Sequence, residues 1–222
     1  MFISGPPMRD TLCALTHKVA TAIALGTLLS LTACATLESP EDARLSTATS
    51  MQRAYSETLD LDGRLSVQYQ KDDKDEAIHV SFTWKQSRER NTITILSPLG
   101  QILATIAVTP DSATLTQSGQ APRNAADADA LAQQALGWPL PVSGLRSWLQ
   151  GYAIDAGNRA FIASPSNTKV TTRDGWHIRY QSWQDDNQPA TSSRPKRIDL
   201  ERQTEQAGKV AIRIVLDNWQ TQ

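Results

Sequence analysis

The sequence predicts a mainly β protein, in which an antiparallel meander of about nine strands or more curls around a short helical insert. Three observations support this fold class. Apolar and polar residues alternate over much of the chain, which is the period of a half-buried strand. Short turns join successive strands, which favours antiparallel pairing with one apolar and one wet face. A stretch rich in Ala, Gln and Leu interrupts the strands near the middle of the chain.

The meander is expected to begin at residue 61, where the apolar spacing changes from three or four residues to two. The charged run 71–76 is expected to form a hairpin turn. Ahead of the meander, a helix is predicted from five apolar residues at helical spacing: Leu45, Ala48, Met51, Tyr55 and Leu59. Strands are predicted at residues 61–69, 78–84, 93–95, 102–108, 113–117, 169–172, 176–183, 198–200 and 210–216, with a polar loop at 185–195.

The helical insert separates two groups of strands. Residues 125–136 predict a helix with Asn124 as its N-cap and Gly137 as its C-terminal stop. Two prolines follow, and they exclude a continuous helix because each restricts the backbone of the residue before it. Ser143 is then expected to cap a second short helix over residues 144–150.

The N-terminus predicts a secretion signal, with positive charges ahead of an apolar stretch that is too short to span a bilayer. The residues Leu31-Thr32-Ala33-Cys34 follow, and they resemble the lipobox of bacterial lipoproteins, which is cleaved just before the cysteine that carries the lipid. The alternative is an ordinary secretory signal with a chance cysteine. The predicted organisation is a lipoprotein signal peptide at 1–33, a lipidated tether at 34–44 with Cys34 as the acylated residue, and one domain at 45–222.

Composition argues against several function classes. A net charge of −1 and a pI near 6.3 disfavour a nucleic-acid binder. The two cysteines, Cys13 and Cys34, both precede the predicted domain, and the three histidines are too few for a multi-histidine metal site. His79 and His177 fit solvated strand positions. The chain contains neither a Gly-rich phosphate loop nor a Gly-x-Ser-x-Gly elbow, so we expect no catalysis, cofactor or metal.

The apolar residues of each predicted strand share one phase, so they face the same side of the sheet. A curled sheet of this size is wide enough to leave a ligand-holding interior, and a packed helix-on-sheet core is the alternative. Trp84 and Trp148 are the strongest candidates for the lining. The full candidate lining is Leu65, Val67, Phe82, Trp84, Ile93, Ile95, Ile106, Trp148, Trp176 and Tyr180, and each of these also fits an ordinary core.

The residues Ser97-Pro98-Leu99-Gly100 fit a type I turn, with Pro at its second position and Gly at its fourth. This turn places Leu99 at a hairpin tip, where Asn, Asp or Gly is usual. The Leu99 side chain either folds back over the mouth of the barrel or projects from it.

Five motifs occur in order behind the lipobox: G-R-L at 63–65, F-x-W at 82–84, S-P-L-G at 97–100, G-W-P-L-P-x-x-x-L-R-x-W-L-x-G at 137–151, and D-N-W at 217–219. In this order they resemble the LolB family, the outer-membrane lipoprotein receptors of the lipoprotein localisation pathway. The resemblance covers essentially the whole mature chain, and the motif at 137–151 is its most specific part.

The resemblance implies an unclosed antiparallel β-barrel with an α-helical lid over an apolar cavity. It also implies a monomer, anchored by lipid on the periplasmic side of the outer membrane, that is not an enzyme. Such a receptor accepts lipoproteins with three acyl chains from the periplasmic carrier LolA and inserts them into the inner leaflet of the outer membrane. The family places Leu99 on a protruding loop that inserts into the membrane. The alternative is an outer-membrane lipoprotein scaffold with a packed core that binds other envelope proteins.

Overall fold

The computed structural model describes residues 53–184 and 193–221 of the 222-residue chain. The chain divides into two compact units, Met1–Ser46 and Thr47–Gln222, and every described residue belongs to the second unit. The predicted signal peptide, Cys34, the tether and the first part of the predicted helix therefore lie outside the described residues. So does 185–192, which is most of the predicted polar loop.

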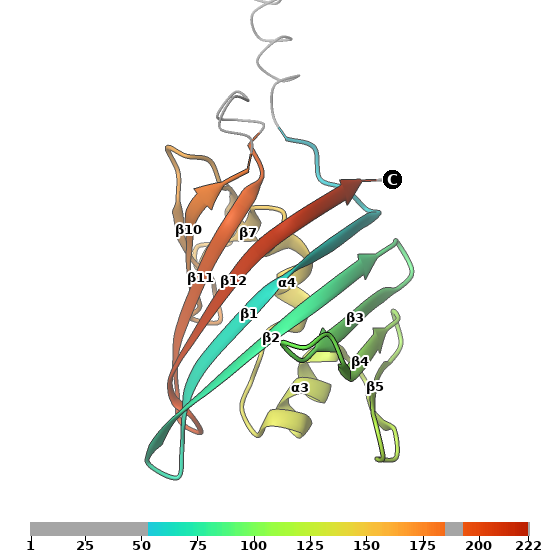
Figure 1. Ribbon diagram of the computed structural model, residues 1–222. Coiled ribbons are helices and arrows are strands. Elements are labelled where there is room, and N and C mark those ends of the chain that lie inside the picture. Colours follow the sequence, from blue (N-terminus) through green and yellow to red (C-terminus); the bar gives the residue numbers. More distant parts are fainter. Residues whose placement is uncertain (1–52, 185–192, 222) are drawn as a thin grey trace, which may run out of the picture. The chain divides into compact units, whose positions relative to one another are not determined.

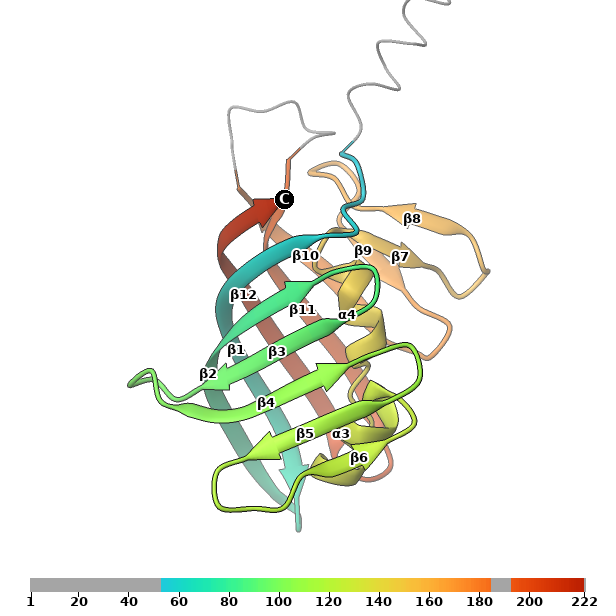
Figure 2. The ribbon, with the colours of Figure 1, turned by 90° about the vertical axis from the view of Figure 1, so that its right-hand side faces the viewer.

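Ten strands form one antiparallel sheet in the order β6-β5-β4-β3-β2-β1-β12-β11-β10-β9. Since β6 and β9 are edges and do not pair with each other, the sheet curves without closing (Figure 2). This confirms the predicted unclosed antiparallel barrel. The strands are β1 (Leu59–Lys71), β2 (Lys74–Gln86), β3 (Asn91–Leu96), β4 (Ile102–Val108), β5 (Ala113–Gln117), β6 (Arg123–Ala125), β9 (Lys169–Thr171), β10 (His177–Trp183), β11 (Pro195–Thr204) and β12 (Gly208–Thr221).

Two helices, α3 (Ala128–Leu136) and α4 (Val142–Trp148), lie on the concave side of the sheet, between its two ends (Figure 1). Gly137 ends α3 as predicted, with a left-handed φ of 80° and an N–H that donates to the Gln133 carbonyl. The predicted N-cap was wrong. Asn124 belongs to β6, and the side chain of Asp127 caps α3 by accepting from the N–H of Ala130.

The second helix also begins differently from the prediction. Pro141 occupies the N-cap of α4, and its side chain makes no capping hydrogen bond. Ser143 is the second residue of the helix instead of its cap. Its N–H donates to Asp129 over 2.8 Å, and its hydroxyl also bonds that carboxylate. Ser143 therefore joins the two helices to each other.

The hairpin between β1 and β2 has a tight two-residue turn. Its turn contains only Asp72 and Asp73, both at positive φ (51° and 58°), a geometry that matches the twist of paired strands. The predicted turn at 71–76 was too long, because the charged residues after Asp73 continue the ladder of β2.

On β1, a bulge falls between Asp62 and Gly63, and a Cβ at Gly63 would lie 2.2 Å from the Val215 carbonyl oxygen. The glycine of the G-R-L motif is therefore required by backbone packing.

Two further predictions need correction. The predicted helix does not extend to its last residues, since the chain is irregular from Arg53 and Leu59 already belongs to β1. Residues after 151 were expected to be irregular, but β7 (Tyr152–Ile154) and β8 (Ala160–Ile162) form a separate two-stranded sheet. Strands of three residues are too short to show alternation in the sequence. Within the described residues, no helix is long and apolar enough to cross a membrane.

Candidate functional site

The candidate site is the concave face of the sheet together with the helices that cover it. All ten predicted lining residues belong to one apolar assembly on this face. Seven of them are buried and three are partly exposed. The buried ones are Val67, Phe82, Trp84, Ile93, Trp148, Trp176 and Tyr180; the partly exposed ones are Leu65, Ile95 and Ile106.

The partly exposed residues are neighbours across β1 to β4. The register pairs Phe82 with Ile95 and pairs Ile93 with Ile106, so these side chains occupy adjacent rows of one face. Leu140 and Leu145, on the helical insert, are partly buried against the same core. We call these five side chains the apolar strip: Leu65, Ile95, Ile106, Leu140 and Leu145. The structure therefore places incompletely covered apolar surface beneath one side of the helices.

Trp148 attaches α4 to the opposite side of the concave face. The side chain is 6% exposed, and its backbone carbonyl accepts a hydrogen bond of 3.1 Å from the Tyr180 hydroxyl. Burial raises the pKa of Tyr180, so this hydroxyl keeps its proton and remains a donor. Gly144 makes room for the indole, because a Cβ there would lie 2.6 Å from the Trp148 ring.

Arg146 ties α4 to the strands that carry the apolar strip. Its guanidinium donates to the Ser87 carbonyl over 3.0 Å and to the Asn91 side chain over 3.2 Å, at the turn between β2 and β3. It also donates to the Tyr55 hydroxyl and forms an ion pair of 3.1 Å with Glu57. Arg146 thus holds α4 against the turn between β2 and β3, next to the strands that carry the apolar strip.

Arg53 holds the residues that follow α4. This side chain is buried, and its guanidinium donates to the backbone carbonyls of Gln150, Ala163 and Ser193. Burial lowers the pKa of Arg53, although the neighbouring Tyr152 partly opposes that effect. Gly151 permits the approach, since its φ is +82° and a Cβ there would lie 2.4 Å from the guanidinium. The final glycine of the 137–151 motif therefore makes space for a buried arginine.

Trp138 covers the far end of the helical pair. It is 3% exposed, and its ring lies 5.8 Å from that of Tyr69 on β1. This contact packs the connection between α3 and α4 directly against the sheet.

The loop between β3 and β4 projects away from the helices (Figure 2). It forms the predicted turn: the Gly100 N–H donates to the Ser97 carbonyl over 2.9 Å, and Gly100 has a φ of 81°. The Ser97 hydroxyl also accepts from the N–H groups of Leu99 and Gln101, which makes the loop well ordered. Leu99 is 89% exposed, so its side chain does not fold back over the barrel.

Among residues 53–184 and 193–221, no group of three or more His, Cys, Asp or Glu side chains could hold a metal ion. His177 bonds the Thr171 hydroxyl on the outer face, and His79 lies exposed on β2. Neither histidine contacts the apolar strip.

Comparison with solved structures finds low overall similarity. A LolA superfamily protein from Nitrosomonas europaea has a TM-score of 0.43 and 12% identity, over 81% of this chain and 92% of that one.

The sequence comparisons define the class. The model of the family "Outer membrane lipoprotein LolB" matches residues 57–219. The outer-membrane lipoprotein LolB of Cupriavidus metallidurans is 36% identical over 199 residues, which is 88% of this chain and 93% of that protein. That of Shewanella sp. (strain MR-4) is 30% identical over 212 residues, 92% of this chain and 91% of that protein.

The chain belongs to the LolB family. It is therefore an outer-membrane lipoprotein and the receptor of the lipoprotein localisation pathway, in a family that is not enzymatic. The predictions of family, fold class, function class and location are confirmed.

Sequence reasoning missed the polar residues that hold the helices. Arg146 lies inside the motif at 137–151, so its position was visible although its partners were not. Arg53 carried no signal, because its three carbonyl partners are 97 to 140 residues away in the chain. Pattern analysis identifies apolar faces but not contacts of such long range.

Proposed function

We propose that this chain is anchored through an acylated Cys34, receives triacylated lipoproteins from the periplasmic carrier LolA, and inserts them into the inner leaflet of the outer membrane. The observation that carries the proposal is the apolar strip, which gives acyl chains a surface beneath the helices. A triacylated lipoprotein exposes on the order of 45 methylenes, and moving them through water would cost roughly 35 kcal/mol. A receptor must therefore present apolar surface from arrival to release.

Acyl chains enter by displacement of α4 from the sheet. Polar contacts hold this helix along the strip: Arg146 is only partly buried, and Arg53 reaches backbone carbonyls alone, one of them just beyond the helix. Breaking such contacts costs far less than unpacking a sheet. The candidate lining then serves in two ways: the strip takes the first methylenes, and Trp84 and Trp148 line the deeper space that opens.

A photocrosslinking amino acid at Ile106 or Trp148 tests this site. With acylated donor lipoprotein present, the probe at either position is expected to capture an acyl chain, and an environment-sensitive apolar dye is expected to be displaced competitively. Capture of neighbouring side chains alone, with no dye binding, would contradict the cavity. A probe at Thr94, on the opposite face of β3, is the matched control and should capture no cargo.

A scaffold with a packed core is the second candidate, because seven of the ten lining residues are buried. It predicts a partner on the outside of the barrel and no acyl-chain contact inside. Native mass spectrometry of the purified chain separates the two functions. Co-purified acylated lipid or peptide supports the receptor, and a bare chain with a bound envelope protein supports the scaffold.

The proposed anchor is tested at Cys34. Cys34→Ser is expected to abolish acylation and to leave the precursor uncleaved. Replacing residues 1–34 by a signal without a lipidation site is expected to release the chain into the periplasm with cargo acceptance retained. Fractionation measures both outcomes, and tight membrane association of the second variant would show that another element anchors the domain.

A further inference from the structure

A small hollow of about 280 Å³ lies on the outer face of the sheet, at the base of the β3–β4 loop. Its size is close to the lower end of the roughly 300–1,000 Å³ of ligand pockets. Two of its lining side chains are basic, Arg64 and Arg213, and His79 lines it beside them. The lining contains no Asp or Glu.

We propose that this hollow binds the phosphate of a phospholipid headgroup and so orients the loop toward the bilayer. This inference rests on the proposed insertion of lipoproteins into the outer membrane and deepens it, because it names the lipid group that the protein recognises.

The strand register brings Arg64, His79 and Arg213 together. Ser66 on β1 pairs with His79 on β2 and with Arg213 on β12, so all three form one row of the outer face. Arg64 lies two residues from Ser66 on the same face and is diagonal to both His79 and Arg213, a separation of roughly 7–8 Å. Three long side chains at these spacings can converge on one anion.

Both arginines retain donors for a phosphate. Arg64 gives two N–H groups to Asp217, at 3.0 and 2.8 Å, and Arg213 gives its Nε to Asp199 at 3.4 Å. A guanidinium has five N–H donors, so several on each side chain are not used by these carboxylates. The two side chains are 66% and 59% exposed, which leaves those donors accessible to a headgroup.

The hollow is continuous with the exposed apolar side chains of the loop. Pro98 forms part of its wall, and Leu99 follows directly. On the strand after the loop, Ile102 is 62% exposed and Leu103 is 45% exposed. Apolar side chains that enter the acyl region and basic side chains that meet the headgroups form the usual pair of contacts at a membrane surface.

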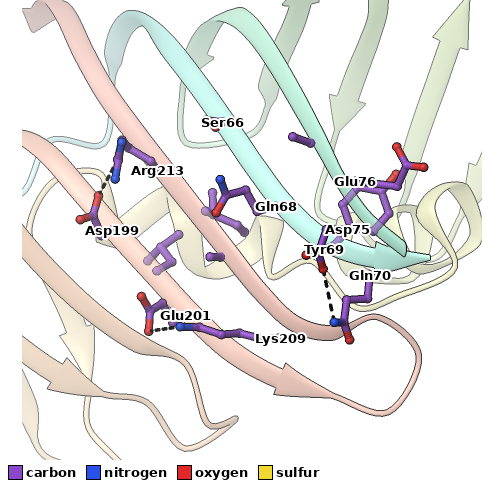
Figure 3. A pocket seen from close by; sticks show the side chains of 14 residues that line it. Ser66, Gln68, Tyr69, Gln70, Asp75, Glu76, Asp199, Glu201, Lys209 and Arg213 are labelled. Atoms are coloured by element: carbon purple, nitrogen blue, oxygen red, sulfur yellow. Dashed lines mark hydrogen bonds and ion pairs between the residues drawn. The ribbon is translucent and has the colours of Figure 1, made fainter. Parts of the chain in front are cut away.

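A second hollow on the same face supplies the contrast (Figure 3). It measures about 530 Å³ and is lined by Asp75, Glu76, Asp199 and Glu201 against Lys209 and Arg213. Its acidic excess disfavours a phosphate. Figure 3 shows Arg213 and Lys209 on the same strand, each paired with an acid, at 3.4 and 3.3 Å. Lys209 is therefore a matched control for Arg213.

The test uses the full mature, acylated chain in vesicles of phosphatidylethanolamine and phosphatidylglycerol. The probe is a phosphatidylethanolamine with a photoreactive group on its head. Crosslinks are expected on the segments of β1, β2 and β12 that contain Arg64, His79 and Arg213. Arg213→Glu should lower their yield at least about fivefold, since each charge near an anionic surface changes binding by about that factor. Lys209→Glu should leave the yield unchanged.

His79→Glu is the second variant and should lower the yield in the same way, even where Arg213→Glu fails to fold. Equal losses from the Arg213 and Lys209 variants, or no crosslinks on these strands, would overturn the proposal. So would suppression by millimolar inorganic phosphate, which would identify a site for a free anion. Cargo acceptance from the carrier is measured on the same vesicles. Normal acceptance without crosslinks refutes the headgroup site alone, whereas absent acceptance refutes the proposed receptor function.

Discussion

The two halves of the concave face differ in how completely they are covered. On β10, β11 and β12, the inward side chains Ile178, Ile198, Leu200 and Val210 are at most 1% exposed. On β3 and β4, Ile95, Ala104, Ile106 and Val108 are only partly buried. The same alternating pattern and the same residue types occur in both halves. Residue type alone therefore does not decide which half is fully buried and which half keeps partly exposed apolar side chains.

The features connected with cargo and membrane gather on the less covered half. The apolar strip lies on its inner side, Arg146 holds α4 against its turn, and the loop with Leu99 joins β3 to β4. Arg53 holds the residues that follow α4, through the carbonyls of Gln150, Ala163 and Ser193. We infer that the packed half serves as a fixed frame, against which α4 opens over the other half.

The largest expected difference is between two isoleucines. Ile198→Ala empties a fully buried site between Tyr180 and Ile214, and should lower the free energy of unfolding by about 2–5 kcal/mol. Ile106→Ala removes the same atoms from a partly exposed site and should cost clearly less. Denaturant unfolding, followed by tryptophan fluorescence, measures both. Equal losses would show that the two halves are equally packed, which would contradict the comparison.

Substitutions of Arg53 and Arg146 are expected to have different effects on stability and on the opening of α4. Arg53→Ala removes a buried donor from three carbonyls and should cost about 1.5–3 kcal/mol of unfolding free energy. Arg146→Ala should cost less stability, because its side chain is partly exposed, but should let α4 open more readily. An apolar dye that binds the concave face should therefore bind Arg146→Ala more tightly. Unchanged dye binding would argue against α4 as the moving element.

The sequence predicted the long strands, because a sheet with one apolar face shows its period directly. It also predicted the Ser97–Gly100 turn and the end of α3, since glycine at positive φ is a local signal. It did not predict where each helix begins, because β6 takes up Asn124 and leaves Asp127 as the cap of α3, and Pro141 begins α4 without a capping side chain. It also could not divide the ten lining residues between core and strip.

Leu99→Glu is expected to change the function of the β3–β4 loop without changing the stability of the barrel. The side chain is 89% exposed, so stability should hardly change, and cargo acceptance should persist because the strip is untouched. Insertion of one Leu into lipid contributes about 1.5–3 kcal/mol, so delivery into membranes should fall roughly tenfold or more. Transfer of labelled lipoprotein from the carrier to liposomes measures the effect. Normal delivery, or a loss of several kcal/mol in stability, would refute the assignment.

The smallest effect is expected on the outer side of the packed half, which carries the ion pairs of Asp199 and Glu201. Among the described residues, β3 to β6 form no ion pair, and threonines occupy much of their outer side. Burial alone would raise the pKa of Asp199, but hydrogen bonds and charge from Arg197 and Arg213 outweigh it and lower the pKa below its ordinary value.

A lowered carboxyl pKa stabilises the fold at pH values above the ordinary aspartate value of about 3.9, and this contribution is lost as pH falls through the lowered value. Asp199→Asn should therefore be less stable than the native chain at pH 7, and the two should converge below about pH 4. Denaturant midpoints from pH 7 to pH 2 measure the convergence. Because the partners of Asp199 are largely exposed, 1 M salt should shrink the difference at pH 7. A stability difference that persists at low pH would mean that Asp199 stabilises the packed half through packing and not through its charge.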